Sequence, residues 1–115
     1  EFVLSFSDKD RLWIAEIDDR IIGSIAISGH SKSDAQLHWL LVHPDYRGLG
    51  LGRELLTEAL KFCKGRYKKV FLWTASELRA AHHLYADAGF KKTDEKKHKI
   101  WGKIIMEERY DLLLP

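Results

Sequence analysis

Three glycines alternate with leucines at positions 48–52, directly after an apolar run and Pro44. The apolar run ends at residues 40–42 and has strand character, whereas the residues after Gly52 repeat with helical spacing. Glycine lets a backbone approach a ligand closely, and the first turn of a helix leaves N–H groups unpaired at the positive end of its dipole. A strand, a glycine turn and a helix in this order predict an anion site at residues 47–53, and the expected anion is a phosphate group.

The length and composition of the chain limit the classes of protein to consider. A chain of 115 residues, 45% hydrophobic and 31% charged, fits one globular domain over residues 1–115. A net charge of +2 gives little reason to expect a nucleic-acid partner. Cys63 is the single cysteine, which excludes an internal disulfide and favours a reducing, cytoplasmic setting. No run approaches the roughly 20 apolar residues of a membrane span, so we expect no membrane partner.

Hydrophobic periodicity predicts an α/β (α+β) fold, a mixed central sheet flanked by helices. We expect a hairpin over residues 11–28, a strand over 35–42, a helix from the glycines to Gly65, and a strand over 69–75. A second helix follows, capped by Ser76 and ended by Gly89. The chain then continues as a basic strand edge and loop over 91–99 and a final strand over 103–112, which Glu108 interrupts. Residues 2–6 are expected to be the last turn of a helix. The strand over 35–42 ends apolar on both faces, which predicts burial in the middle of the sheet.

Two other phosphate-binding motifs do not fit the glycine run. A P-loop needs Lys and then Ser or Thr after its last glycine, and here Arg53 and Glu54 follow. A dinucleotide fold needs Gly-x-Gly-x-x-Gly, whereas the glycines here recur at every second position.

Residues 47–52, Arg-Gly-Leu-Gly-Leu-Gly, match the Arg/Gln-x-x-Gly-x-Gly/Ala signature of GNAT-type N-acetyltransferases. Downstream, Ala81-x-x-Leu84-Tyr85-x-x-Ala88-Gly89-Phe90 resembles the second landmark of that family, a helix that ends in Leu-Tyr and then Gly-Phe. The order, separation and element types of the two motifs agree with the family. The chain therefore resembles a GNAT domain, which implies the GNAT acyl-CoA N-acyltransferase fold. The sequence around the two motifs is similar to that of acetyltransferase domains fused behind MarR-type regulators.

This resemblance implies direct transfer of an acetyl group from acetyl-CoA to an amine of a small molecule or protein, with no metal. In that picture the N–H groups of residues 49–53 hold the pyrophosphate beside Arg47, and the backbone at residues 41 and 42 pairs with the pantetheine arm. The Val42 N–H would stabilise the oxyanion on the thioester carbonyl. The expected cofactor-binding residues are Leu41, Val42, Arg47, Gly48, Leu49, Gly50, Leu51, Gly52 and Arg53.

Two catalytic residues are expected from the same resemblance. Tyr85 aligns with the family tyrosine that donates a proton to the departing CoA thiolate, and its alternative role is that of a core tyrosine. His38 lies on the strand that leads to the cofactor site, where a neutral imidazole could accept the amine proton. A strand histidine without a catalytic role is the alternative for His38, and Glu16 and His98 are other candidates for the base.

The front of the chain departs from the family pattern, because a complete GNAT domain has a strand and two helices before the hairpin. We therefore expect an N-terminally truncated domain, with the acceptor amine undetermined. The alternative function is a non-catalytic acyl-CoA-binding or sensing module of a larger regulator. A basic nucleic-acid-binding domain that rests on residues 91–99 is a third hypothesis. A fused or neighbouring regulator domain and a homodimer are also considered.

Overall fold

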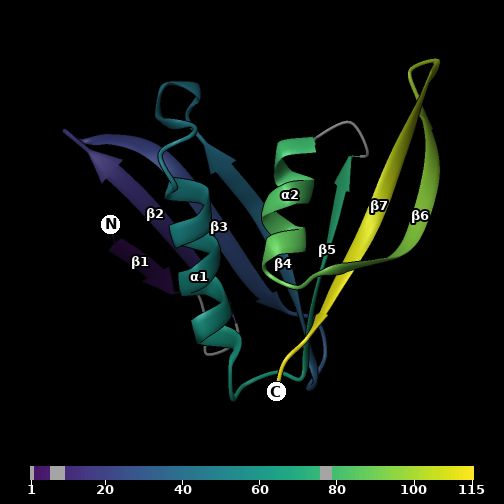
Figure 1. The fold of residues 1–115 in the computed structure, drawn as a ribbon, viewed down its shortest axis with the longest axis horizontal. Coiled ribbons are helices and arrows are strands. Elements are labelled where there is room, and N and C mark those ends of the chain that lie inside the picture. Colours follow the sequence, from purple (N-terminus) through teal and green to yellow (C-terminus); the bar gives the residue numbers. More distant parts are fainter. Residues whose placement is uncertain (1, 6–9, 76–78) are drawn as a thin grey trace.

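A computed structural model describes residues 2–5, 10–75 and 79–115 of the chain. Within them one seven-stranded sheet carries two α-helices and a short 3₁₀ helix (Figure 1). The elements in chain order are β1 (Phe2–Ser5), β2 (Arg11–Ile17), β3 (Arg20–Gly29), β4 (Asp34–Val42), the 3₁₀ helix η1 (Pro44–Tyr46), α1 (Leu51–Cys63), β5 (Lys69–Ala75), α2 (Arg79–Asp87), β6 (Lys91–Ile100) and β7 (Lys103–Leu113).

The sheet has the strand order β1-β2-β3-β4-β5-β7-β6, and it is mixed as predicted. All neighbouring strands are antiparallel except β4 and β5, which are parallel and joined by the α1 crossover. This parallel pair follows from the strand, helix, strand order of the sequence. Figure 1 shows both helices in front of the sheet, α1 over β2 and β3 and α2 beside β5.

One hydrophobic core lies between the helices and the sheet. The apolar stripe of α1 supplies Leu55, Leu56 and Cys63, which are buried, and Ile25 and Leu72 meet it from the sheet. Burial raises the pKa of the Cys63 thiol to about 12, so the thiol stays protonated and unreactive. Cys63 is therefore a structural residue of the buried face of α1.

A β-bulge divides β4 into two parts. Residues 34–36 pair with residues 69–71 of β5, and residues 35 and 36 also pair with β3. We call residues 34–36 the closed end of the split. Between His38 and Leu41 the register against β3 shifts, and Trp39 adopts a positive φ of 54°. Residues 37–42 pair only with β3 within the described sheet, and we call them the open end.

The bulge changes the expected burial of β4. Trp39 and Leu41 were expected on the same face as the buried Leu37, but they are 66% and 64% exposed. The expectation of a buried strand end is therefore wrong, because one extra residue in the strand turns the following side chains away from the core. β4 and β5 separate after Gln36, so the open edge of β4 begins at residue 37, well before the expected contacts at residues 41 and 42.

Three other expectations about the elements need correction. Residues 2–5 form a strand instead of a helix end, because they pair antiparallel with the otherwise open edge of β2. Glu108 does not interrupt β7, because its carboxylate binds Lys92 and the Tyr110 hydroxyl and so tolerates partial burial. Residues 91–99 lie wholly within the exposed edge strand β6. The expected cap at Ser76 lies outside the described residues.

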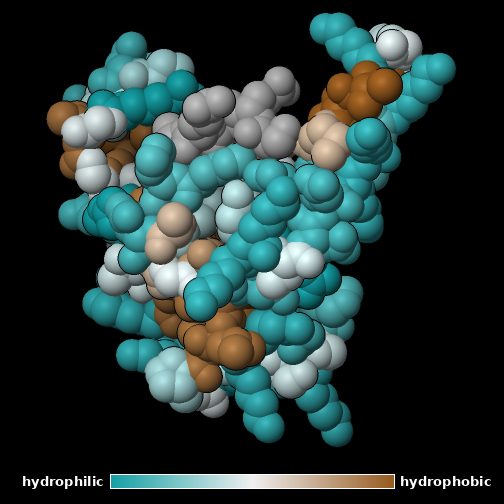
Figure 2. All heavy atoms as spheres, turned by 45° about the vertical axis from the view of Figure 1, so that its right-hand side comes forward, coloured by the Kyte–Doolittle hydropathy of each residue, from teal (hydrophilic) through white to brown (hydrophobic). Residues whose placement is uncertain are grey.

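The hairpin of β6 and β7 projects from the body of the sheet, and Figure 2 shows apolar surface near its tip. Trp101 is 99% exposed there, beside the exposed Ile100 and Ile104. Among the described residues, no helix has the length and hydropathy needed to cross a membrane.

Candidate functional site

The glycine turn after η1 places the start of α1. Gly48 and Gly50 adopt positive φ values of 79° and 84°, and Gly50 is the residue before the first turn of the helix. An added Cβ at either position would meet no atom within 4 Å, so the backbone conformation, and not the available space, requires glycine. The first backbone hydrogen bond of α1 runs from the Glu54 N–H to the Gly50 carbonyl, at 3.0 Å. The N–H groups of residues 51–53 therefore have no intrahelical acceptor in the described structure and suit an anion.

Two arginines lie on either side of this turn. The Arg47 Nε donates to the Val42 carbonyl at 3.1 Å, which ties the turn to the end of β4. The Arg53 Nη2 lies 2.8 Å from the Asp87 Oδ2, which ties the first turn of α1 to the last turn of α2. Each guanidinium keeps further N–H donors for a phosphate. Sequence reasoning missed Asp87, and no local pattern could have found it because 34 residues separate it from Arg53.

A groove of about 610 Å³ begins at the glycine turn and follows the outer side of α1. Leu49, Gly50 and Arg53 line the end next to the turn, and Glu54 and Glu58 line the other end. Since carboxylates repel phosphate, the end at Gly50 is the part of the groove that suits an anion.

The open end of β4 supplies backbone groups beside this turn. Leu41 and Val42 pair with β3 on one side and face the gap between β4 and β5 on the other. An extended chain can therefore add to this edge as a strand would. The Val42 carbonyl already accepts the Arg47 Nε, so that group is engaged within the protein.

Tyr85 lies on α2 near the point where the two helices and β4 converge. A Cβ added to Gly52 would lie 3.5 Å from the Leu84 Cδ2 and 3.6 Å from the Val42 Cγ2, so α1, α2 and β4 come close together here. The Tyr85 ring is buried against Phe90 and Tyr110, with centroid distances of 5.7 and 6.4 Å. Its packing fits the expected core role, and a proton-donor role for the hydroxyl is compatible with it.

The protonation state of Tyr85 follows from its burial. Burial raises the pKa of the Tyr85 phenol to about 12, so the hydroxyl keeps its proton at neutral pH. No group in the described part of the chain forms a hydrogen bond with this hydroxyl. Among the described residues, the hydroxyl is thus a proton donor without an acceptor.

His38 lies just before the bulge, on the face of the sheet opposite the helices. Its neighbour Leu37 belongs to the helix-side core, and side chains alternate along the strand. The His38 Nε2 lies 2.7 Å from the Ser28 Oγ, and burial lowers the pKa of the imidazole even though the charge of Asp10 raises it. His38 is therefore neutral at pH 7 and can accept a proton.

The other titratable candidates have separate contacts. His98 pairs with Glu107 at 2.7 Å on the β6–β7 hairpin. His82 contacts the Ala75 carbonyl and Glu108, which accounts for both ring nitrogens. Over the ranges that the structure describes, no three His, Cys, Asp or Glu side chains are grouped to hold a metal ion.

Gly23 is a packing residue that the sequence analysis did not single out. A Cβ there would lie 3.1 Å from the side chains of Leu51 and Leu55 and 3.2 Å from the Leu41 carbonyl. Gly23 therefore lets the first turns of α1 approach the open end of β4. The available signal was a lone glycine inside an apolar strand, which often marks a close approach of another element.

Comparison with known proteins agrees with this geometry. Residues 2–90 match the model of the acetyltransferase (GNAT) family. The uncharacterized N-acetyltransferase MJ1207 of Methanocaldococcus jannaschii is 30% identical over 109 residues, which cover 89% of this chain and 46% of that protein. The chain thus spans about half the length of the curated relatives it matches.

Two solved structures show the same fold. A GNAT family acetyltransferase from Streptococcus pneumoniae superposes with a TM-score of 0.85 at 24% identity, covering 95% of this chain and 70% of that one. A GNAT family acetyltransferase from Elizabethkingia anophelis, solved with acetyl-CoA bound, gives 0.77 at 19% identity over 92% of this chain and 77% of that one. With the glycine turn, the split sheet and the family match in agreement, the chain belongs to the acetyltransferase (GNAT) family.

Proposed function

We propose that this chain transfers an acetyl group from acetyl-CoA to an amine of a small molecule or protein. The observation that carries the proposal is the juxtaposition of the glycine turn, with its unpaired N–H groups, and the open end of β4. The relatives named as N-acetyltransferases and the solved family member with acetyl-CoA bound support the same activity.

The site fits acetyl-CoA along its length. The N–H groups of residues 51–53 and the free donors of Arg47 and Arg53 would hold the pyrophosphate. The edge of β4 at residues 41 and 42 would pair with the amide groups of the pantetheine arm. This pairing would bring the thioester to the gap between β4 and β5, where the Val42 N–H would stabilise the negative charge on its carbonyl oxygen.

The chemistry then uses one residue from each face of the sheet. The amine attacks the thioester carbon and gives up its proton, for which neutral His38 is the candidate acceptor. As the C–S bond breaks, the protonated Tyr85 hydroxyl donates to the sulfur, and CoA leaves as the thiol. A strand histidine that only binds Ser28 remains the alternative role for His38.

The test is release of free CoA thiol from acetyl-CoA by the full chain with a pooled panel of amines, together with thermal stabilisation by CoA. We expect stabilisation and amine-dependent thiol release. Stabilisation without release would favour the second candidate, a non-catalytic acyl-CoA-binding or sensing module. The absence of stabilisation at millimolar CoA would contradict both, because a ligand that binds the folded state raises its stability.

We also propose that the domain works in the cytoplasm within a longer protein that carries a MarR-type regulator, and that it forms a homodimer. Support for the regulator comes from the similarity of the sequence around the two motifs, including residues 110–112, Tyr-Asp-Leu, to acetyltransferase domains fused to such regulators. Light scattering on the full-length natural protein tests the dimer: a monomer mass at all concentrations would remove it. DNA binding that acetyl-CoA modulates would support the fusion.

A further inference from the structure

A second groove, of about 550 Å³, opens at the C-terminal end of α1 beside β2. The helix has 13 residues, and a rise of 1.5 Å per residue places this groove about 20 Å from the glycine turn. The groove shares none of its lining residues with the expected acetyl-CoA contacts. Its volume lies in the range of small-molecule sites.

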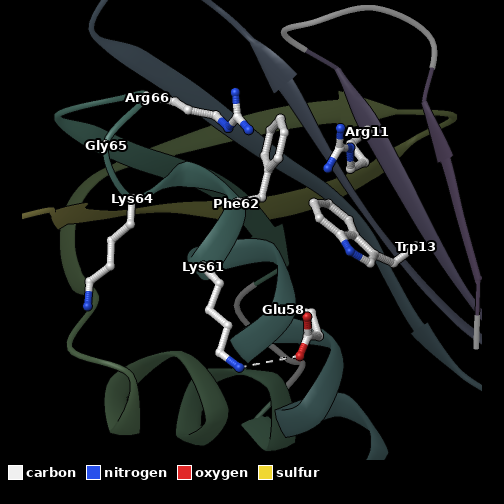
Figure 3. Close-up of a pocket in the computed structure, with 8 residues that line it drawn as sticks. All are labelled: Arg11, Trp13, Glu58, Lys61, Phe62, Lys64, Gly65 and Arg66. Atoms are coloured by element: carbon white, nitrogen blue, oxygen red, sulfur yellow. Dashed lines mark ion pairs between the residues drawn. The ribbon is translucent and has the colours of Figure 1, made fainter.

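The centre of this groove is the ring of Phe62, which lies between two guanidinium groups (Figure 3). The Arg11 Cζ lies 4.4 Å from the ring centroid, and the Arg66 Cζ lies 4.5 Å from it. Arg11 comes from β2 and Arg66 from the turn after α1, so two distant segments are brought together here. Both guanidiniums are in cation–π contact with this buried ring.

Neither guanidinium has an ion-pair partner in the described structure, and the Arg11 Nε is buried without a hydrogen bond. Other arginines of the chain do have carboxylate partners, Asp87 for Arg53 and Asp111 for Arg109. The remaining cations of the groove contribute less, because Lys61 pairs with Glu58 and Lys64 points away from Phe62 in Figure 3.

Two simpler explanations account for part of this arrangement. The helix dipole favours a cation near the C-terminal end of α1, and this explains the presence of Arg66. Packing against Phe62 explains the positions of both arginine side chains. Neither neutralises the charges of the two guanidiniums, which have no ion-pair partner in the described structure, and an anion in the groove would do so.

We propose that the groove binds a small molecule with a multiply charged oxyanion group, a phosphate ester or a polycarboxylate. The planar forks of Arg11 and Arg66 match the paired oxygens of such a group. Because the Phe62 ring separates the two guanidiniums, such a molecule would lie across the ring and present anionic oxygens to each arginine, and Trp13 would line the same groove. This site is independent of the proposed acetyl transfer.

The test is an NMR titration of the full chain that follows the arginine Nε–Hε and glycine amide resonances. The probes are inorganic phosphate, pyrophosphate and citrate, with sodium chloride at matched ionic strength as the control. We expect saturable shifts of Arg11 and Arg66 that chloride does not produce. Pyrophosphate bound at the glycine turn is distinguished because it would shift Gly50 instead. Saturation by the phosphates alone assigns a phosphate ester, and saturation by citrate alone assigns a polycarboxylate.

Substitutions distinguish bidentate binding by the guanidiniums from attraction by positive charge alone. Arg11→Gln with Arg66→Gln should weaken binding by about tenfold or more, whereas Arg20→Gln, at an exposed strand end, should leave it unchanged. Arg11→Lys with Arg66→Lys keeps the charge and loses the fork, so it should also weaken binding. The proposal is overturned if no probe gives saturable shifts in the wild-type chain, or if the double Gln variant binds as tightly as wild type. The wild-type titration stands even if a variant fails to fold.

Discussion

The closed and open ends of β4 differ in what surrounds them. At the closed end, residues 35 and 36 have a strand on both sides, and Ala35 pairs with Val70, both fully buried. At the open end, residues 37–42 have a strand on one side only, and the exposed Leu41 lies near the glycine turn. Both ends share one strand and one core.

This difference indicates a division of labour along a single strand. Backbone groups that are already paired contribute to stability, whereas unpaired groups at an edge remain available to a ligand. We therefore expect substitutions near the open end to change acetyl transfer with little change in stability. Substitutions at the closed end should do the reverse.

The largest expected effect is at Tyr85, on α2. Tyr85→Phe should lower kcat by about 10²- to 10⁴-fold, the usual contribution of a general acid, with little change in acetyl-CoA affinity. Unfolding free energy should hardly change, because the hydroxyl has no internal hydrogen bond in the described structure. Steady-state kinetics and urea unfolding measure the two effects. The control is Tyr67→Phe, a buried tyrosine after α1, and an equal loss of kcat in both variants would contradict the comparison.

The next effect is at the closed end. Val70→Ala removes two methyl groups from a fully buried site, which should lower the unfolding free energy by about 2 to 3 kcal/mol. Urea denaturation gives this value, and kcat per folded molecule should stay within about twofold of wild type. A large loss of kcat with unchanged stability would contradict the proposal that the closed end serves stability rather than acetyl transfer.

A smaller effect is expected from the charged group that flanks the closed end. Burial raises the pKa of Asp111, but hydrogen bonds from Arg109 and Thr93 and the nearby Lys69 lower it below its usual range overall. A lowered folded pKa stabilises the protein above the ordinary Asp value of about 3.9, and this stabilisation is lost as the pH falls through the folded pKa. Asp111→Asn should therefore cost about 1 to 2 kcal/mol at pH 7.

Unfolding curves between pH 7 and pH 2.5 test the direction of this pH dependence of stability. The difference between wild type and Asp111→Asn should be constant from pH 7 to about pH 5 and should shrink below about pH 4. A difference that grows on acidification would show that the carboxylate destabilises the native state. Exposed Asp45→Asn is the matched control.

The smallest effect is at the glycine turn. Gly50→Ala forces a side chain into a positive φ of 84°, which costs about 1 kcal/mol where nothing clashes. Because the strain relaxes by moving the first turn of α1, acetyl-CoA affinity should fall by about fivefold, as measured by calorimetry. Ala substitution at Gly65, which also has a positive φ but follows α1, should cost similar stability and leave affinity unchanged.

Features fixed by short stretches of sequence were predictable here. The glycine turn, the C-terminal Gly89 of α2 and the return of Phe90 onto Tyr85 each follow from neighbouring residues. The bulge at Trp39 was not predictable, because its cause is the pairing with β3 and not the apolar alternation of β4 itself.

Contacts between distant segments also escaped prediction. Residues 2–5 carry no helix or strand pattern of useful length, and their structure depends on the edge of β2. The pair of Arg53 and Asp87 and the stacking of Arg11 on Phe62 join residues with no sequence relation. For the same reason the roles of Tyr85 and His38 remain predictions, whereas their burial and neighbours are observed.

The short closed end also has a consequence for the cooperativity of the fold. Three residue pairs are the only strand pairing that joins the β1–β4 meander to the β5–β7 group in the described sheet. α1 packs on β2, β3 and β4, so it belongs with the meander. We expect native-state hydrogen exchange to resolve two units with different opening free energies. A ligand that spans the gap would then slow exchange in both units together and make the domain unfold as one.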